Sequence, residues 1–164
     1  MKRFLYFLLA CLLLLSACSF GTPAANSTTF YYCKADYGYG DSQGIIAGES
    51  RELSQNASDL TDTLALYLVG PLDEGLYSPL VDMKLLSVKE RDGHLQIRLS
   101  EPPEPLSDAA FSLGAACLTL TSLELTDLSQ VTVTCPEHSV TMDRDNLLFL
   151  DNTTSAETIM EEPQ

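Results

Sequence analysis

Side chains that could carry out catalysis are few in this chain of 164 residues. There are two histidines, His94 and His138, and no Gly-rich phosphate loop of the P-loop or dinucleotide type. Asp36 and Asp41 flank a Tyr-Gly-Tyr-Gly run, but the acidic spacing of an EF-hand loop is absent. The other carboxylates lie mostly in loops and near the last residues, where solvation accounts for them. Their number alone does not exclude a glycosidase-like pair of carboxylates. The sequence therefore predicts no catalytic residue, no cofactor and no metal site, and a protein that is not an enzyme.

Cys18 is the cysteine with the clearest chemical context. A short basic start precedes an apolar run over residues 5–15, which is typical of a signal peptide and too short to span a bilayer comfortably. The run ends in Leu15-Ser16-Ala17-Cys18, which resembles the lipobox of bacterial lipoproteins. The resemblance implies a signal peptide over residues 1–17. It also implies a diacylglyceryl (palmitate-type) group on Cys18 that anchors the protein to the extracytoplasmic face of the cell membrane. An ordinary secretory signal with a chance cysteine is the alternative.

Three cysteines would remain beside the lipidated one, because Cys11 leaves with the signal peptide. Cys33 and Cys135 fall in predicted strands from opposite ends of the domain and form a candidate disulfide, although neither spacing nor sequence settles the connectivity. Cys117 falls on an apolar helix face and is expected to be an inert buried thiol. No Cys-x-x-Cys or Cys/His spacing indicates a metal.

The charge of the chain excludes one class of partner. The formal net charge is −14, and loss of the two basic residues of the signal peptide takes it to −16. Such an acidic surface repels nucleic acid and anionic lipid head groups, so nucleic-acid binding is excluded. The lipid on Cys18 must then hold the protein at the membrane by itself.

The clearest helix lies between residues 59 and 70. Its apolar residues recur at helical spacing and form one stripe, which comprises Leu60, Leu64, Tyr67 and Leu68. Asn56 is the expected N-cap, with Asp59 three residues later. Gly70 can adopt the left-handed conformation past a helix end, and Pro71 cannot continue the helix. This helix must therefore cover a sheet.

A hairpin is the firmest prediction for the sheet. Leu95, Ile97 and Leu99 alternate strictly with polar residues after Asp92-Gly93, and an Asp-Gly pair between apolar alternating runs is the strongest short-range signal of a tight turn. His94 stands beside this turn and is expected to be solvated.

The remaining elements complete a pattern of strands and helices. Residues 30–37 are aromatic and predict a first strand. Ser107 is a good N-cap for a second helix that runs to about residue 123, with Gly114-Ala-Ala116 keeping one face small. Residues 131–135 predict the next strand, and residues 139–142 and 147–150 a final short pair.

The order strand, helix, strand, strand, helix, strand predicts an α+β fold. We expect a two-layer sandwich, β-α-β-β-α-β, with two helices on one face of a small mixed sheet. The expected domain covers residues 30–150. It follows a lipid-anchored flexible linker over residues 18–29 and precedes an acidic disordered tail over residues 151–164.

Several segments together carry a family resemblance. Glu49-Ser-Arg51, Leu-Tyr-Leu-Val-Gly-Pro71, Gly75-Leu-Tyr-Ser-Pro79, Leu85-Leu-Ser-Val88, Asp92-Gly93 and Ile97-Arg-Leu-Ser100 resemble the GerMN domain of sporulation and spore-germination proteins. The resemblance implies a fold like the ring-building motifs of secretion-type assemblies and a membrane-tethered module that binds protein partners in the cell envelope. The sporulation protein itself is similar to a tandem of two such domains, whereas this chain has room for one.

Two function classes follow. The first is a non-catalytic protein-interaction module of the cell envelope, in which the sheet or its edge strand contacts a partner, for example by strand addition, with a link to sporulation or germination. The second is a cell-wall (peptidoglycan) or small-ligand binding lipoprotein that stacks sugars on Tyr37, Tyr39 and Tyr77. The sequence does not identify the partner.

Overall fold

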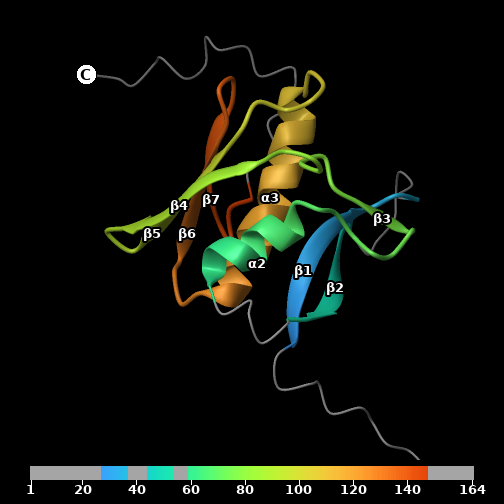
Figure 1. The fold of residues 1–164 in the computed structure, drawn as a ribbon, viewed down its shortest axis with the longest axis horizontal. Helices are drawn as coiled ribbons and strands as arrows, with labels where there is room; N and C mark the ends of the chain where they lie inside the picture. The colour runs from blue at the N-terminus through green and yellow to red at the C-terminus, as the bar shows by residue number, and fades with distance from the viewer. Residues whose placement is uncertain (1–26, 37–43, 54–58, 148–164) are drawn as a thin grey trace, which may run out of the picture.

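A three-stranded sheet, a four-stranded sheet and two helices make up the part of the chain that the structure, a computed structural model, describes: residues 27–36, 44–53 and 59–147. The long helix α3 (Asp108–Leu125) runs between the two sheets, and the short helix α2 (Leu60–Tyr67) lies beside it (Figure 1).

The three-stranded sheet is antiparallel and has the order β2-β1-β3. β1 (Ser27–Lys34) is its central strand, with β2 (Ile46–Glu52) on one side and the two-residue strand β3 (Leu76–Tyr77) on the other. β1 begins at Ser27, so the strand starts inside the residues that the sequence assigned to the linker. The predicted linker over residues 18–29 therefore extends too far, because residues 27–29 belong to β1.

The four-stranded sheet is mixed and has the order β4-β5-β6-β7. Its strands are β4 (Leu85–Arg91), β5 (His94–Leu99), β6 (Gln130–Thr134) and β7 (Ser139–Asp143). β5 and β6 are parallel and are joined through α3, while the two outer pairs are antiparallel. Asp92 (φ 54°) and Gly93 (φ 79°) form the predicted turn, and Leu95, Ile97 and Leu99 are buried as the alternation required.

Helix α2 is confirmed with a corrected start. The carboxylate of Asp59, not Asn56, is the N-cap and accepts a hydrogen bond from the Thr61 N–H at 3.3 Å. Asn56 lies outside the described residues. The helix stops as expected, with Leu68 as C-cap and Gly70 at φ 106°, a conformation that favours glycine.

Helix α3 is buried along most of its circumference. Ser107 is the predicted N-cap and accepts from the Ala110 N–H at 3.2 Å. The buried positions include neighbours such as Ala115, Ala116, Cys117 and Leu118, which cannot all lie on one stripe. A helix that is apolar all round needs cover on more than one side. α3 accordingly packs on β1 with one face and on β6 and β7 with another.

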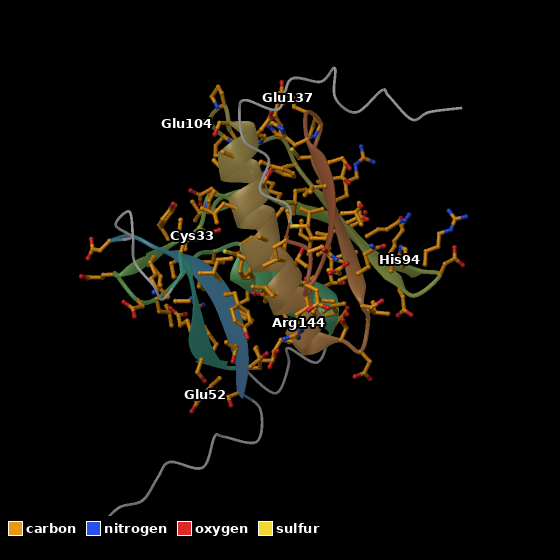
Figure 2. The ribbon with its side chains drawn as sticks, turned by 180° about the vertical axis from the view of Figure 1, so that it is seen from behind. Cys33, Glu52, His94, Glu104, Glu137 and Arg144 are labelled. Atoms are coloured by element: carbon orange, nitrogen blue, oxygen red, sulfur yellow. The ribbon has the colours of Figure 1, made fainter. Side chains whose placement is uncertain are left out.

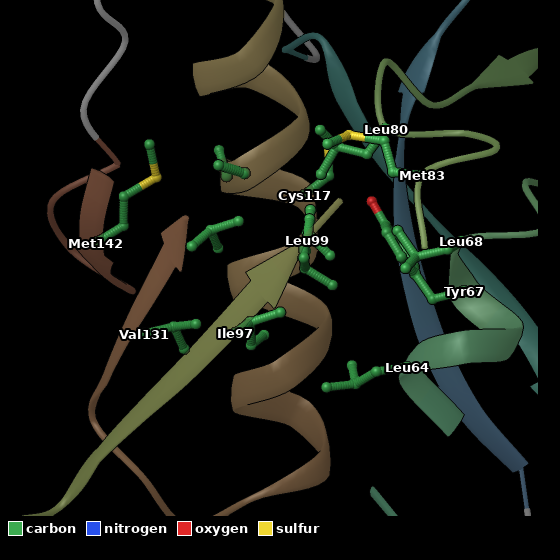
Figure 3. Packing of buried hydrophobic residues seen from close by; sticks show 14 of the residues in the cluster. Leu64, Tyr67, Leu68, Leu80, Met83, Ile97, Leu99, Cys117, Val131 and Met142 are labelled. Atoms are coloured by element: carbon green, nitrogen blue, oxygen red, sulfur yellow. The ribbon is translucent and has the colours of Figure 1, made fainter. Parts of the chain in front are cut away.

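The α+β class, the two helices and the mixed sheet of the prediction are confirmed, and one feature differs. The strand at residues 30–37 was expected in the same sheet as the hairpin, but β1 belongs to the separate three-stranded sheet. The physical reason is the second apolar side of α3, which β1 covers. The core accordingly includes residues of β1. It also draws residues from both helices and from β5, β6 and β7 (Figure 3). Of the predicted last strand, residues 148–150 lie outside the described part, and Leu147 is not in a strand.

Candidate functional site

The predicted anchor cannot be located in the fold, because Cys18 and the whole of residues 1–26 lie outside the described residues. The same holds for the predicted tail over residues 151–164. Among the helices that are described, none is long and apolar enough to cross a membrane.

The two histidines do not meet. His94 begins β5 and is exposed, on the other side of α3 from Cys33 (Figure 2). His138 is half-buried after β6, where its Nδ1 lies 3.0 Å from Asp108 Oδ1 and its Nε2 lies 3.2 Å from the Leu106 carbonyl oxygen. Its ring stacks on Phe111 with centroids 4.8 Å apart. These contacts tie the β6–β7 connection to the start of α3, which is a structural role.

No three His, Cys, Asp or Glu side chains within residues 27–36, 44–53 and 59–147 are placed to hold a metal ion. Asp36 is exposed in a turn after β1, and Asp41 lies outside those ranges. The carboxylate of Asp143, at the end of β7, accepts several hydrogen bonds. Its Oδ1 accepts from the side chain of Asn146 at 3.1 Å and from its backbone N–H at 2.7 Å, and these bonds lower the pKa of Asp143. The contacts close a turn.

The cysteine pairing differs from the prediction. Cys33 on β1 was paired with Cys135, but its Sγ lies 3.6 Å from Sγ of Cys117 in α3. Cys135 is buried at the end of β6, in the other sheet. Cys33 meets Cys117 because β1 packs on α3 instead of joining the sheet that contains β6. The expectation that Cys117 is buried is confirmed.

A buried ion pair that the sequence reading did not identify holds the connection after α2. Arg51 on β2 is 7% exposed and is paired through Nε with Glu49. Its Nη2 donates to the Gly70 carbonyl at 2.6 Å, while Glu49 Oε2 accepts from the N–H groups of Leu72 and Asp73, both at 2.9 Å. One charged pair therefore fixes the backbone of residues 70–73 from inside the molecule.

Aromatic rings complete this support. The Arg51 guanidinium lies 5.4 Å from the ring centroid of Phe30 and 6.0 Å from that of Tyr32. Tyr32 stacks on Tyr67 with centroids 4.9 Å apart, and the Tyr32 hydroxyl donates to the Tyr67 carbonyl at 3.2 Å. Burial raises the pKa of both tyrosines, so the rings stay neutral. The cluster links β1, β2 and the end of α2.

The exposed apolar side chains gather on the chain segment that this network supports. The five large apolar residues that protrude among those described are Val69, Leu72, Tyr77, Val81 and Leu86, with Leu72 the most exposed at 79%. All five lie within residues 69–86, which we call the edge segment. This segment contains β3 and the start of β4, and each of these is an edge strand of its sheet.

A bulge marks the end of the edge segment. Leu85 pairs with Leu99 and Ser87 with Arg98, so Leu86 is the extra residue between two pairings. A bulge re-aims a side chain and interrupts the ladder at a sheet edge. It accompanies the outward position of Leu86, which is 56% exposed.

The tyrosines proposed for sugar stacking are mostly outside the described residues. Tyr37 and Tyr39 are among residues 37–43, whose structure is not described. Tyr77 lies on β3 opposite Cys33 and is 42% exposed. Sugar stacking on these three rings therefore stays a prediction.

The fold is similar to solved structures of a sporulation protein. One is the tandem GerMN domains of the sporulation protein GerM from Bacillus subtilis, with a TM-score of 0.51 and 19% identity over 72% of this chain. The chain spans 42% of the length of that tandem. The other is the first GerMN domain of the same protein, with a TM-score of 0.52 and 16% identity, covering 70% of this chain and 85% of that domain.

No family model matches the sequence, and no curated protein matches it. The likeness at this identity is one of fold. It agrees with the resemblance carried by the motifs between Glu49 and Ser100. The described part of the chain therefore has an α+β fold similar to that of the GerMN domains of GerM.

Proposed function

We propose that this protein is a lipoprotein anchored by Cys18 at the extracytoplasmic face of the cell membrane, and that its GerMN-like domain is a non-catalytic protein-interaction module of the envelope. The Leu15-Ser16-Ala17-Cys18 run after an apolar signal supports the anchor. A diacylglyceryl group has two acyl chains, and each buried methylene contributes about 0.8 kcal/mol to membrane binding, so such an anchor is stable.

The edge segment is the observation that carries the interaction module. Five large apolar side chains protrude on residues 69–86, while the core residues of both sheets and of α3 are buried. Full burial of one such side chain against a partner contributes roughly 1.5 to 3 kcal/mol. Aromatic and aliphatic anchors of this kind dominate the binding energy at the centre of an interface.

The sheet edges suggest how a partner would be held. β4 is an edge strand whose second half, Lys89-Glu90-Arg91, is charged, which protects an edge against unwanted pairing. Its first half carries no charged residue and presents Leu86 at the bulge. A partner strand placed beside this half would gain main-chain hydrogen bonds together with apolar contact.

Rigidity favours binding by this segment. The Glu49–Arg51 pair fixes the backbone at Gly70, Leu72 and Asp73, so Leu72 stands out from a backbone that is already held. A segment fixed before binding loses less conformational entropy on association. Buried ion pairs often contribute little net stability to a fold. Holding the backbone of the edge segment in place is therefore a second role for the Glu49–Arg51 pair.

The arrangement of polar groups favours binding over catalysis. His138 is engaged by Asp108 and the Leu106 carbonyl, and His94 stands apart from it at a turn. A catalytic site would require a nucleophile, a base and an orienting group within hydrogen-bond reach of one another. The described carboxylates of Glu49 and Asp143 are occupied by backbone N–H groups.

The proposal includes a link to spore formation, because the solved structures of similar fold belong to a protein described as a sporulation protein. We expect deletion of the gene to lower the fraction of heat-resistant spores or the rate of their germination. Unchanged spore yield and germination would remove this part of the proposal and leave the interaction module to be judged separately.

Affinity capture from envelopes tests the module. The full chain, with its anchor intact, is cross-linked in cells and captured from detergent-solubilised membranes. We expect one protein partner to be recovered in stoichiometric yield, and to be lost when Val69, Leu72 and Leu86 are all replaced by Ser. A matched variant with Gln96, Thr132 and Thr141 replaced by Ser, on the polar face of the four-stranded sheet, should keep the partner.

Sedimentation with purified peptidoglycan examines the alternative class. The module predicts that the protein stays in the supernatant. Sedimentation with the wall, combined with partner recovery that does not depend on the edge segment, would replace the proposal by a wall-binding lipoprotein. Metabolic labelling with a palmitate analogue, lost in Cys18→Ala, tests the anchor.

A further inference from the structure

Two thiols meet in the interior between β1 and α3. Cys33 Sγ and Cys117 Sγ lie 3.6 Å apart, which is contact distance for two sulfurs, and both residues are fully buried. They are 84 positions apart in the sequence, so the contact is created by the packing of the strand on the helix. The third buried cysteine, Cys135, lies at the end of β6 in the other sheet.

A polar contact one helical turn away fixes the two elements in this register. The Tyr31 N–H donates to Thr121 Oγ1 at 2.9 Å, and the Thr121 hydroxyl donates to the Cys117 carbonyl at 3.0 Å. Tyr31 is two residues before Cys33, and Thr121 is four residues after Cys117. The thiols are therefore held opposite each other by a bond that does not involve sulfur.

We propose that Cys33 and Cys117 are joined by a disulfide in the exported protein. The proposal rests on the extracytoplasmic location proposed above, because disulfides persist in oxidising compartments and are rare in the cytosol. A bond of about 2.05 Å requires the sulfurs to approach by roughly 1.5 Å, a distance that small rotations of the two side chains can cover.

The oxidant is a thiol–disulfide oxidoreductase in its disulfide form. The Cys33 thiolate attacks one sulfur of that disulfide, which forms a mixed disulfide and releases the other sulfur as a thiolate. Cys117 gives up its proton and attacks the Cys33 sulfur, which releases the second thiolate of the oxidant. Two electrons and two protons pass from the cysteine pair to the oxidant, which leaves as a dithiol. Since both thiols are buried in the folded domain, the exchange precedes the final packing of β1 on α3.

The bond would join two residues 84 positions apart and close a loop that includes β2, α2, the edge segment and the hairpin. Closing so long a loop restricts the unfolded chain strongly, so reduction is expected to lower the melting temperature by about 10 °C.

Differential thiol labelling of the full chain from envelopes tests the proposal. The protein is denatured without reductant and alkylated with iodoacetamide, then reduced and alkylated with N-ethylmaleimide, and its peptides are identified by mass spectrometry. The disulfide predicts the second label on Cys33 and Cys117 and the first label on Cys135. The first label on both Cys33 and Cys117 would overturn it.

Single variants provide the controls. In Cys117→Ser, Cys33 should take the first label, and reduction should no longer lower the melting temperature. Cys135→Ser should behave like the original protein. A Cys33–Cys135 or Cys117–Cys135 bridge would also overturn the proposal.

A second preparation separates this proposal from the proposed location. The chain is made in a reducing cytosol, purified reduced, unfolded and refolded with oxidised glutathione. The proposed geometry predicts the Cys33–Cys117 bond there as well, and its absence counts against the proposal. If the protein in cells keeps its signal peptide and lacks lipid, the proposed location has failed, whereas the refolded protein still reports on the cysteine pair.

Discussion

The two sheets of the domain are held together by different means. In the four-stranded sheet, buried and exposed residues alternate along β5 and β7, so one face packs on the helices and the other meets water. In the three-stranded sheet, Tyr32 and Cys33 are buried one after the other, and β2 sends a charged pair, Glu49 and Arg51, toward the interior.

This difference separates local from distant causes of folding. In the four-stranded sheet, β5 and β7 are specified by their own alternation, and a tight turn joins β4 to β5. The three-stranded sheet depends on groups remote in sequence, since Arg51 requires the Gly70 carbonyl and the Tyr31 N–H requires Thr121. The contacts of the Glu49–Arg51 pair also fix the edge segment. Substitutions that affect one sheet and spare the other test this contrast.

Loss of Arg51 should have the largest effect. Arg51→Ala leaves Glu49 without its counter-charge in a largely buried place, and we expect the free energy of unfolding to fall by about 3 kcal/mol. Arg98→Ala, on the exposed face of β5, is the matched control and should change it by no more than about 0.5 kcal/mol. Urea denaturation measures both. Equal losses in the two variants would contradict the contrast.

Gly114→Ala is expected to come next. A Cβ at Gly114 would lie 2.6 Å from Cγ of the buried Leu80, so we expect a loss of about 2 kcal/mol from overpacking. At Gly48, on the exposed part of β2, an added Cβ would lie 2.7 Å from the terminal methyl of Thr29 and 3.6 Å from the Tyr31 ring. Thr29 is only half-buried, so Gly48→Ala should cost less than Gly114→Ala. The loss should shrink in a Leu80→Ala background, and an unchanged loss there would show that the contact is not its cause.

Gly93→Ala should have a smaller effect, confined to the hairpin. Gly93 has a φ of 79° and no atom within 4 Å of an added Cβ, so backbone strain alone should cost about 1 kcal/mol. Amide hydrogen exchange should speed up in β4 and β5 and stay constant in β1 and β2. Equal loss of protection in both sheets would contradict their separate support.

The loss of folding stability at acid pH should be smaller still, and it should begin in the three-stranded sheet. Burial alone would raise the pKa of Glu49, but the Asp73 N–H, Arg51 and the Leu72 N–H lower it overall. The carboxylate therefore stabilises the fold above its unfolded pKa of about 4.3, and this contribution is lost as the pH falls through the lower folded pKa. Glu49→Gln should flatten the stability profile below about pH 5. An identical profile in that variant would refute the assignment.

Leu72→Ser should have the smallest effect on stability. The side chain is 79% exposed, so the free energy of unfolding should change by no more than about 0.5 kcal/mol, although partner recovery should fall. Thermal melting measures the first quantity and affinity capture the second. A large loss of stability would show that Leu72 supports the fold itself.

The sequence was sufficient where the cause is local. The end of α2 at Gly70 and the hairpin turn at Asp92-Gly93 follow from steric rules for two or three residues, and both are confirmed. The N-cap was placed at Asn56 instead of Asp59 because both carry a capping oxygen, and the choice depends on where the preceding chain turns into the helix.

The sequence was insufficient where the cause lies far along the chain. A charged residue in a strand is usually read as exposed, and nothing near Arg51 indicates that the Gly70 carbonyl will meet it. The contact of Cys33 with Cys117 likewise follows from the packing of β1 on α3. The local pattern of the edge segment does not separate protruding apolar residues from core residues, and only the tertiary structure identifies those that protrude.

The most direct test of the account is site-specific photo-cross-linking in cells. A photoreactive amino acid replaces Leu72 on the edge segment in one strain and Thr132 on the polar face of the four-stranded sheet in another. We predict a discrete protein adduct from position 72 and none from position 132. An adduct only from position 132, or none from position 72 despite normal anchoring of the protein, would contradict an interaction module that works through its edge segment.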